Sequence, residues 1–112
     1  MKVLVTGAAG FIGGQLWHIL WQRGDEVVGI DNFSYGNLDN LKFDDHDFGP
    51  EVRRIDIRDR EALPALFEAE KFDVVYNIAG IAPLPDCQSD PVQAIEVNTM
   101  GLVHVLEWAR RT

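Results

Sequence analysis

The stretch Thr6-Gly7-Ala8-Ala9-Gly10-Phe11-Ile12-Gly13 decides the fold of this chain. It follows the apolar run Val3-Leu4-Val5 and opens a segment in which apolar residues recur at helical spacing. Glycines at positions 7, 10 and 13 predict a strand, a tight turn and the first turn of a helix. Unpaired N–H groups and the helix dipole at such a helix start favour anions, so the pattern predicts a cradle for a pyrophosphate.

The segments beyond this turn alternate between short β-branched runs and longer helical stretches. Strands are predicted at 2–6, 26–30, 52–57 and 73–78, and helices at 11–23, 59–70 and 91–110. Residues 31–50, rich in Asn, Asp, Gly and Ser, predict a loop with a short helical turn at 38–43. Right-handed crossovers then imply a parallel sheet of strand order 3-2-1-4 with helices on both faces, an α/β fold of the Rossmann type.

Two details of the predicted elements can be checked against a structure. In the first helix, one apolar stripe is expected to face the core: Ile12, Leu16, Ile19 and Leu20. Trp17 and Trp21 share one face of that helix, and either packing under a neighbouring element or contact with a partner would explain them. Cys87 is expected in a proline-containing loop.

The composition limits the classes of function. A chain of 112 residues predicts one small domain. A net charge of −8 opposes nonspecific binding to nucleic acid or to an anionic membrane, because both polyanions would be repelled. One cysteine allows no internal disulfide, no apolar run approaches the ~18 residues of a membrane span, and the three histidines lack metal-ligand spacing. We therefore expect a cytoplasmic protein without a metal site.

The three glycines of the turn have separate expected roles. Gly7 permits the tight turn, Gly10 lets the backbone approach a pyrophosphate, and Gly13 lets the helix pack closely on the strand. The amides of Phe11 and Ile12 lie at the helix start and are expected to bind the phosphates. The alternative is a plain glycine turn of an α/β protein. The strand before the turn and the helix after it favour the binding function.

Asp31 stands at the end of the second predicted strand, 18 residues after Gly13. A carboxylate at that place can accept hydrogen bonds from both ribose hydroxyls of an adenosine. It would also repel a 2′-phosphate, and no Lys or Arg lies between Asn32 and Asn40 to offset that repulsion. The expected cofactor is therefore NAD in preference to NADP. The alternative is that Asp31 only begins a turn.

Two further strand ends contribute candidate residues. Asp56 could accept from the amino group of an adenine, with Ile57 against the ring, or it could be a helix cap or a surface acid. Ile78-Ala79-Gly80 follow the fourth strand, where ligands of open α/β sheets gather, and their small size leaves room for a cofactor.

Taken together, these residues resemble the extended short-chain dehydrogenase/reductases, and more narrowly the NAD-dependent epimerase/dehydratase family of UDP-glucose 4-epimerase-like enzymes. The matching motifs are Thr6-Gly7-x-x-Gly10-Phe11-Ile12-Gly13, Asp31-Asn32 with Ser34 and Gly36, Asp56-Ile57-Arg58-Asp59, and Val97-Asn98-x-x-Gly101. The resemblance implies that Phe11 and Ile12 hold the pyrophosphate. It implies further contacts to the cofactor from Asp31, Asn32, Asp56, Ile57, Ile78, Ala79, Gly80 and Asn98.

The chain also departs from the family pattern. Asn77 stands where the family usually has His, and Ala82 and Pro83 occupy a stretch where UDP-galactose-type epimerases often carry Lys, so the sugar substrate stays open. The family's acid/base pair is Tyr-x-x-x-Lys, and neither Tyr35 nor Tyr76 is followed by Lys at that spacing. We expect 1–112 to be the N-terminal portion of an NAD(P)-binding Rossmann domain. Strand five, the catalytic helix and the substrate domain are expected to lie outside it, and no catalytic residue is assigned.

The resulting hypothesis is that this chain is the NAD-binding portion of a nucleotide-sugar epimerase/dehydratase. Such an enzyme transfers a hydride transiently at a sugar carbon. On this hypothesis the chain alone is inactive, the full enzyme binds a nucleotide sugar, and the last helix contributes to a homodimer. The alternatives are a non-catalytic NAD-binding or redox-sensing module, and an NAD(P)-dependent alcohol or ketone reductase of the same family.

Overall fold

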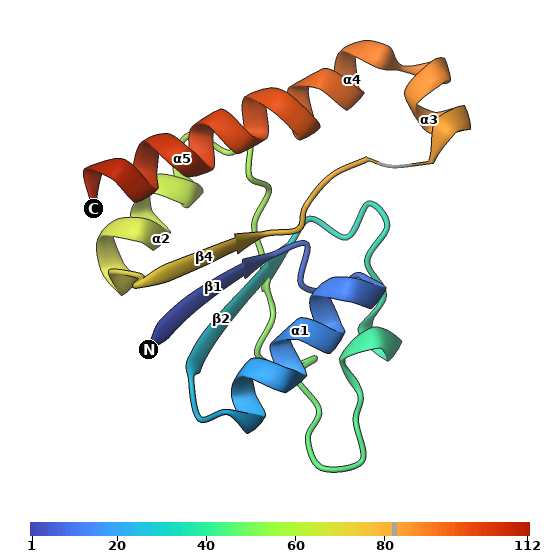
Figure 1. Cartoon of the computed structure of the whole chain (residues 1–112). Helices are drawn as coiled ribbons and strands as arrows, with labels where there is room; N and C mark the ends of the chain where they lie inside the picture. The colour runs from blue at the N-terminus through green and yellow to red at the C-terminus, as the bar shows by residue number, and fades with distance from the viewer. Residues whose placement is uncertain (82) are drawn as a thin grey trace.

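A computed structural model describes residues 1–81 and 83–112. Strands and helices alternate along most of the chain, as Figure 1 shows. In the first half they are β1 (Lys2–Thr6), α1 (Phe11–Gln22), β2 (Glu26–Asp31), the 3-10 turn η1 (Leu38–Leu41) and β3 (Arg53–Arg54). In the second half they are α2 (Ala62–Glu70), β4 (Val74–Asn77), α3 (Leu84–Ser89), α4 (Pro91–Ile95), the π-helical segment η2 (Glu96–Gly101) and α5 (Leu102–Arg111).

The sheet has the predicted order, β3-β2-β1-β4, and all its pairs are parallel. β1 lies in the middle, with Val5 opposite Gly29 of β2 and Tyr76 of β4. Its apolar residues alternate between two cores, because successive side chains of a strand point to opposite faces. This burial on both faces accounts for the unbroken apolar run that precedes the glycine turn.

Helices cover both faces of the sheet (Figure 1). α1 packs on β1 and β2 from one side, whereas α2 and α5 lie together on the other side. On the α1 side the buried core consists of Val3, Val5, Ala8, Ala9, Trp17, Leu20, Leu41 and Phe48. On the opposite side it consists of Leu4, Val28, Ile30, Ile57, Leu63, Leu66, Phe67, Ile81, Val97 and Val105.

The buried face of α1 differs from the predicted stripe, which is wrong at Ile12 and Ile19. These side chains are 67% and 59% exposed. The buried residues of the helix are Gly13, Gly14, Trp17 and Leu20. A Cβ on Gly13 would lie 2.1 Å from the carbonyl oxygen of Gly7. The helix therefore turns its glycine side toward the strand–helix turn, and Ile12 is rotated outward as a consequence.

Packing inside the protein, and not contact with a partner, explains the tryptophan at position 17. Its ring stacks on Phe48 with centroids 5.0 Å apart, and it occupies the space that a side chain at Gly29 would need. Trp21 is partly exposed and stacks on His46 at a centroid distance of 4.8 Å. Both rings thus help to hold the segment between η1 and β3 against α1.

The third strand is much shorter than the predicted 52–57. Only Arg53 and Arg54 pair with β2, opposite Ile30 and Asp31. After Arg54 the chain leaves the sheet, and the Ile57 side chain enters the core on the α2 and α5 side. Apolar periodicity alone does not reveal this departure, because Ile55 and Ile57 are apolar whether or not they belong to the sheet.

The last predicted helix begins as expected but is not uniform. The Asp90 side chain accepts a hydrogen bond of 3.0 Å from the Gln93 amide, and Pro91 is the first helical residue. The helix then passes through the π-helical η2 before α5. Cys87 lies in the short helix α3, so its expected loop position is wrong. Ala82 lies outside the described residues. In the part of the chain that the structure describes, no helix is long and apolar enough to cross a membrane.

Candidate functional site

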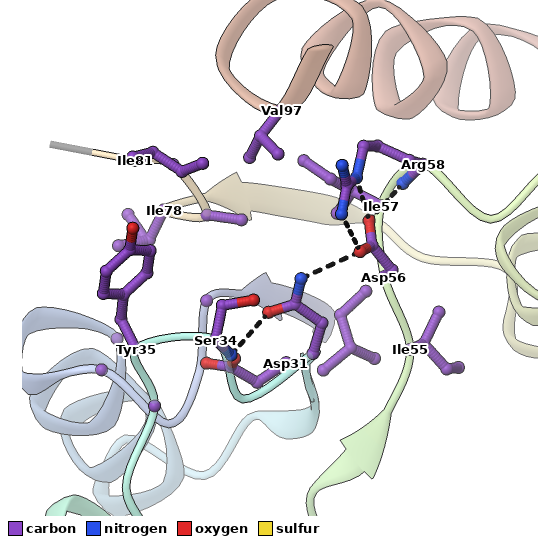
Figure 2. Close-up of a pocket in the computed structure, with 18 of the residues that line it drawn as sticks. Asp31, Ser34, Tyr35, Ile55, Asp56, Ile57, Arg58, Ile78, Ile81 and Val97 are labelled. Carbon is purple, nitrogen blue, oxygen red and sulfur yellow. Dashed lines mark hydrogen bonds and ion pairs between the residues drawn. The ribbon is translucent and has the colours of Figure 1, made fainter. Parts of the chain in front are cut away.

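A cavity of about 360 Å³ lies at the carboxyl ends of the four strands, beside the glycine turn. β1 is flanked there by β2 and β4, so the cavity occupies the position where the strand order reverses. Figure 2 shows side chains from both halves of the chain pointing into it. Of the residues predicted from the sequence, the lining contains Gly7, Gly10, Phe11, Ile12, Gly13, Asp31, Asn32, Asp56, Ile57, Ile78, Ala79 and Gly80.

The glycines of the turn meet different constraints. Gly7 has a φ of +65°, and a Cβ there would lie 2.8 Å from the amide nitrogen of Ala79. Gly13 faces the Gly7 carbonyl, as described above. A Cβ on Gly10 would meet only the Gly7 oxygen, at 3.3 Å. The fold therefore requires glycine at 7 and 13, whereas at 10 the absent side chain mainly keeps the cavity open.

The start of α1 offers hydrogen-bond donors to the cavity. Among the described residues, no hydrogen bond uses the amide N–H of Phe11 or Ile12. The first turn of α1 carries no acidic residue, so no carboxylate competes for these donors. Unpartnered amides at the positive end of a helix dipole, next to a glycine that leaves space, suit a phosphate.

Asp31 is almost fully buried at the end of β2. Its Oδ2 accepts from the Ala9 amide at 2.9 Å, and its Oδ1 accepts from the Phe33 amide at 2.7 Å. The carboxylate thus ties the glycine turn to the loop after β2, so Asp31 does begin a turn. Two carboxylate oxygens have about four acceptor positions, which leaves capacity toward the cavity.

Asn32, Asp56 and Arg58 form a polar network along the cavity. Figure 2 labels Asp56 and Arg58 and marks the bonds between them with dashed lines. Arg58 donates to Asp56 through Nε at 3.0 Å and Nη2 at 2.8 Å, and Asn32 Nδ2 donates at 2.9 Å. These donors, with those from the Arg58 side chain dominant, lower the pKa of Asp56 from 3.8 to about 2 against the opposing effect of burial. The negative charge of Asp56 is therefore balanced by the positive charge of Arg58. Asp59, and not Asp56, accepts from the first amide of α2.

Asn77, the departure from the family pattern, orders the segment after β4. The Thr6 hydroxyl donates to Asn77 Oδ1 at 2.6 Å and accepts from the Ala79 amide at 3.1 Å. The hydroxyl thus links the ends of β1 and β4. In this way residue 77 supports the backbone that closely approaches Gly7.

Asn98 is the predicted site residue that the structure does not bring into the lining of the cavity. Its Oδ1 accepts from the Ile81 amide at 2.6 Å, and its Nδ2 donates to the Ile81 carbonyl at 2.9 Å. Ile81 itself lines the cavity. Asn98 therefore acts on the site through the backbone of Ile81. Asn98 itself lies in the π-helical segment η2.

Several lining residues were not predicted from the sequence: Ser34, Tyr35, Arg58, Ile81, Gln93 and Val97. Ser34, Arg58 and Val97 belong to the quoted motifs, so their proximity to Asp31, Asp56 and Asn98 was a usable signal. Gln93 comes from the last helix outside those motifs, and only the tertiary fold places that helix over the end of the sheet.

Comparison with known proteins agrees with this geometry. The sequence model of the NAD dependent epimerase/dehydratase family matches residues 3–112. The chain belongs to this family. It is 37% identical over 111 residues to UDP-glucuronic acid decarboxylase 1 of Arabidopsis thaliana, covering 99% of this chain and 24% of that protein. It is 34% identical to dTDP-glucose 4,6-dehydratase of Salmonella typhimurium, covering 99% of this chain and 31% of that protein.

Solved structures show the same fold. The UDP-glucose 4-epimerase of Thermus thermophilus, in complex with NAD, superposes with a TM-score of 0.86 at 36% identity, covering 99% of this chain and 34% of that one. Pal from Bacillus thuringiensis gives a TM-score of 0.91 at 33% identity, covering 99% and 36%. The family member described here spans about a quarter to a third of the length of these relatives.

The contrast between Gly10 and Gly13 predicts opposite effects of the same added methyl group. We expect Gly13→Ala to destabilise the fold by about 2–4 kcal/mol, because its Cβ would overlap a backbone oxygen that cannot move aside. Gly10→Ala should change the free energy of unfolding by less than about 1 kcal/mol. Urea unfolding of both variants measures this, and equal losses would contradict the assigned constraints.

The Asp56–Arg58 pair predicts a pH-dependent contribution to stability. Arg58→Met should destabilise the chain at neutral pH by about 1 kcal/mol, since the pair is partly exposed and screened by solvent. Because the folded-state pKa of Asp56 is depressed, this stability is present above about pH 4 and lost as the pH falls through about 2. Urea unfolding of both proteins across this range should show the difference shrinking, whereas a constant difference would exclude the pair as its source.

Proposed function

We propose that this chain is the NAD-binding portion of a nucleotide-sugar epimerase or dehydratase. The observation that carries the proposal is the pair of unpartnered amides at Phe11 and Ile12, which line a cavity that Gly10 keeps open. Membership of an NAD-dependent family supports the cofactor. The named relatives bear the names of enzymes of UDP- and dTDP-sugars, which supports the substrate class.

The residues divide the cofactor between them. We assign the pyrophosphate to Gly7, Gly10, Gly13 and the amides of Phe11 and Ile12. We assign the adenosine ribose to Asp31 with Asn32, the adenine to Asp56 and Ile57, and the remaining cofactor surface to Ile78, Ala79 and Gly80. Bound NAD supplies the hydride acceptor and donor, and the protein supplies position and electrostatics. Asn98 holds the Ile81 backbone and so supports the last of these contacts.

NAD is preferred over NADP for an electrostatic reason. A 2′-phosphate on the adenosine ribose would approach the Asp31 carboxylate, and the two negative charges repel each other. Among the described residues that line the cavity, one carries a guanidinium group, and that residue is Arg58. Its charge is matched by Asp56 and lies 3.8 Å from Glu96, so it offers little to a phosphate.

The chain contributes cofactor binding and not the acid/base step. Neither of its two tyrosines has a lysine at the family spacing, so we propose that the 112 residues alone do not turn over a nucleotide sugar. Measurable epimerisation or dehydration of a UDP-sugar by the purified chain would contradict this. The predicted cytoplasmic location stays a prediction.

The exposed side of the last helix supports self-association. Its exposed apolar residues recur at helical spacing: Val92, Ile95, Met100, Leu102, Val103 and Leu106. Such a stripe on a soluble surface marks a contact site, and we propose that it joins two copies of this chain as a homodimer.

Calorimetric titration with NAD and with NADP tests the cofactor assignment. We expect saturable NAD binding that is at least about tenfold tighter than NADP binding, which corresponds to about 1.4 kcal/mol. Gly10→Ala should weaken NAD binding at unchanged thermal stability, because its methyl group enters the cavity and not the protein interior. A folded chain that binds neither nucleotide would disprove the proposed function, and equal affinities would disprove the role of Asp31 in selectivity.

Sedimentation velocity over a range of concentrations tests the homodimer. We expect a dimer that Leu106→Glu abolishes, since the substitution would place a charge within the apolar stripe. The matched control is Ala69→Glu, which adds the same charge to an exposed position on α2. A monomer at every concentration, or equal effects of the two substitutions, would rule out this surface.

A further inference from the structure

One hydrogen bond joins a loop that lines the cavity to α3, the helix that follows the lining segment on the opposite side. The Tyr35 hydroxyl, on the loop after β2, donates to Asp86 Oδ2 in α3 at 2.9 Å. Within residues 1–81 and 83–112 it is the one hydrogen bond that joins the loop at 32–37 to α3. Figure 2 shows the Tyr35 ring rising from that loop toward the segment that carries Ile78 and Ile81. The ring lines the cavity, whereas Asp86 is not one of the lining residues.

The tyrosine end of this bond is firmly supported. The Asn37 amide donates to the Ala9 carbonyl at 2.9 Å, so the loop is attached to the glycine turn. A Cβ on Gly36 would lie 2.9 Å from the Ala9 side chain and 3.0 Å from Asp31 Oδ2. The backbone beside Tyr35 is therefore pressed against the turn and has little freedom to move.

The aspartate end is supported by the opposite wall. The Cys87 thiol donates to the Ile81 carbonyl at 3.3 Å, and Asn98 bonds both the amide and the carbonyl of the same residue. The bond between Tyr35 and Asp86 thus connects two separately anchored walls. The bond also raises the pKa of Tyr35 above its ordinary value, which already leaves the phenol protonated and able to donate at neutral pH.

From this geometry we propose that Tyr35 and Asp86 form a latch that retains the nucleotide in the cavity, an inference that rests on the proposed function. The bond must open for the nucleotide to enter or leave, because Tyr35 stands between the two walls. Half of the Tyr35 surface is exposed, so water competes for the bond and the latch opens thermally. Tyr35 and Asp86 are positioning residues. Their bond affects the rate at which the nucleotide dissociates more than it affects the structure of the site.

Displacement kinetics test the latch. The chain is loaded with NADH, mixed with excess NAD, and the loss of NADH fluorescence gives the dissociation rate. We expect Tyr35→Phe and Asp86→Ala each to raise this rate about three- to tenfold at an unchanged thermal midpoint, the range expected for the net contribution of one partly exposed hydrogen bond. The double variant should be no faster than either single variant, because both remove the same bond.

Matched variants separate the latch from general effects. Tyr76→Phe removes a phenol hydroxyl outside the cavity lining, and Asp44→Ala removes a carboxylate from an exposed loop, so both should leave the rate unchanged. Asp86→Asn keeps a carbonyl acceptor and should lie closer to the wild type than Asp86→Ala does. Unchanged rates in Tyr35→Phe, or additive effects in the double variant, would overturn the latch while NADH binding by the wild type upheld the proposed function.

Hydrogen exchange provides a readout that needs no nucleotide. We expect the amides of α3 to exchange faster in Tyr35→Phe and in Asp86→Ala than in the wild type, with the amides of β1 unaffected. Equal protection of α3 in all three proteins would overturn the mechanical connection between the walls. A wild-type chain that is folded but binds no NADH would defeat the proposed function and the latch together.

Discussion

The rest of the structure depends on the close approach of three backbone segments at Gly7. The first turn of α1 meets the Gly7 carbonyl so closely that Gly13 has no room for a Cβ, and the segment after β4 approaches from the other side at Ala79. The turn after β1, the adjoining start of α1 and the distant segment after β4 are thereby fixed relative to one another without side chains between them. The start of α1 therefore lies at the end of β1, and the cavity lies between the segments that follow β2 and β4.

Polar side chains then hold the segments that this contact brings together. Asp31 binds the glycine turn to the loop after β2, Thr6 joins the ends of β1 and β4, and Asn98 holds Ile81 from the last helix. Each of these groups satisfies backbone amides or carbonyls that regular secondary structure leaves unpaired where strands end. The candidate site is therefore built from the same bonds that close the fold, and a residue such as Asp31 belongs to both.

The sequence predicted the strand order and most of the lining, because both follow from local patterns. The glycine spacing specifies the turn, and apolar runs separated by helical stretches specify parallel strands. It did not predict the orientation of α1, where close packing at Gly13 outweighs the wider apolar stripe through Ile12 and Ile19. It also missed the early end of β3 and the approach of Gln93 and Val97. Those features depend on contacts between Ile57 and the last helix, where a Cβ on Gly101 would lie 2.5 Å from Ile57 Cδ1.

The charge of the chain and the chemistry of its cavity fit together for a physical reason. A protein with a net charge of −8 attracts no polyanion over long distances, since the summed field is repulsive and salt screens it within about 10 Å. Backbone amides act over shorter distances and carry no net charge, so they can hold a phosphate inside such a field. The Arg58 guanidinium adds little to this, because Asp56 matches it. On the proposed function, an anion in this cavity would be recognised by the geometry of the helix start. Asp31 would then discriminate against an additional phosphate without opposing the two that we assign to the helix start.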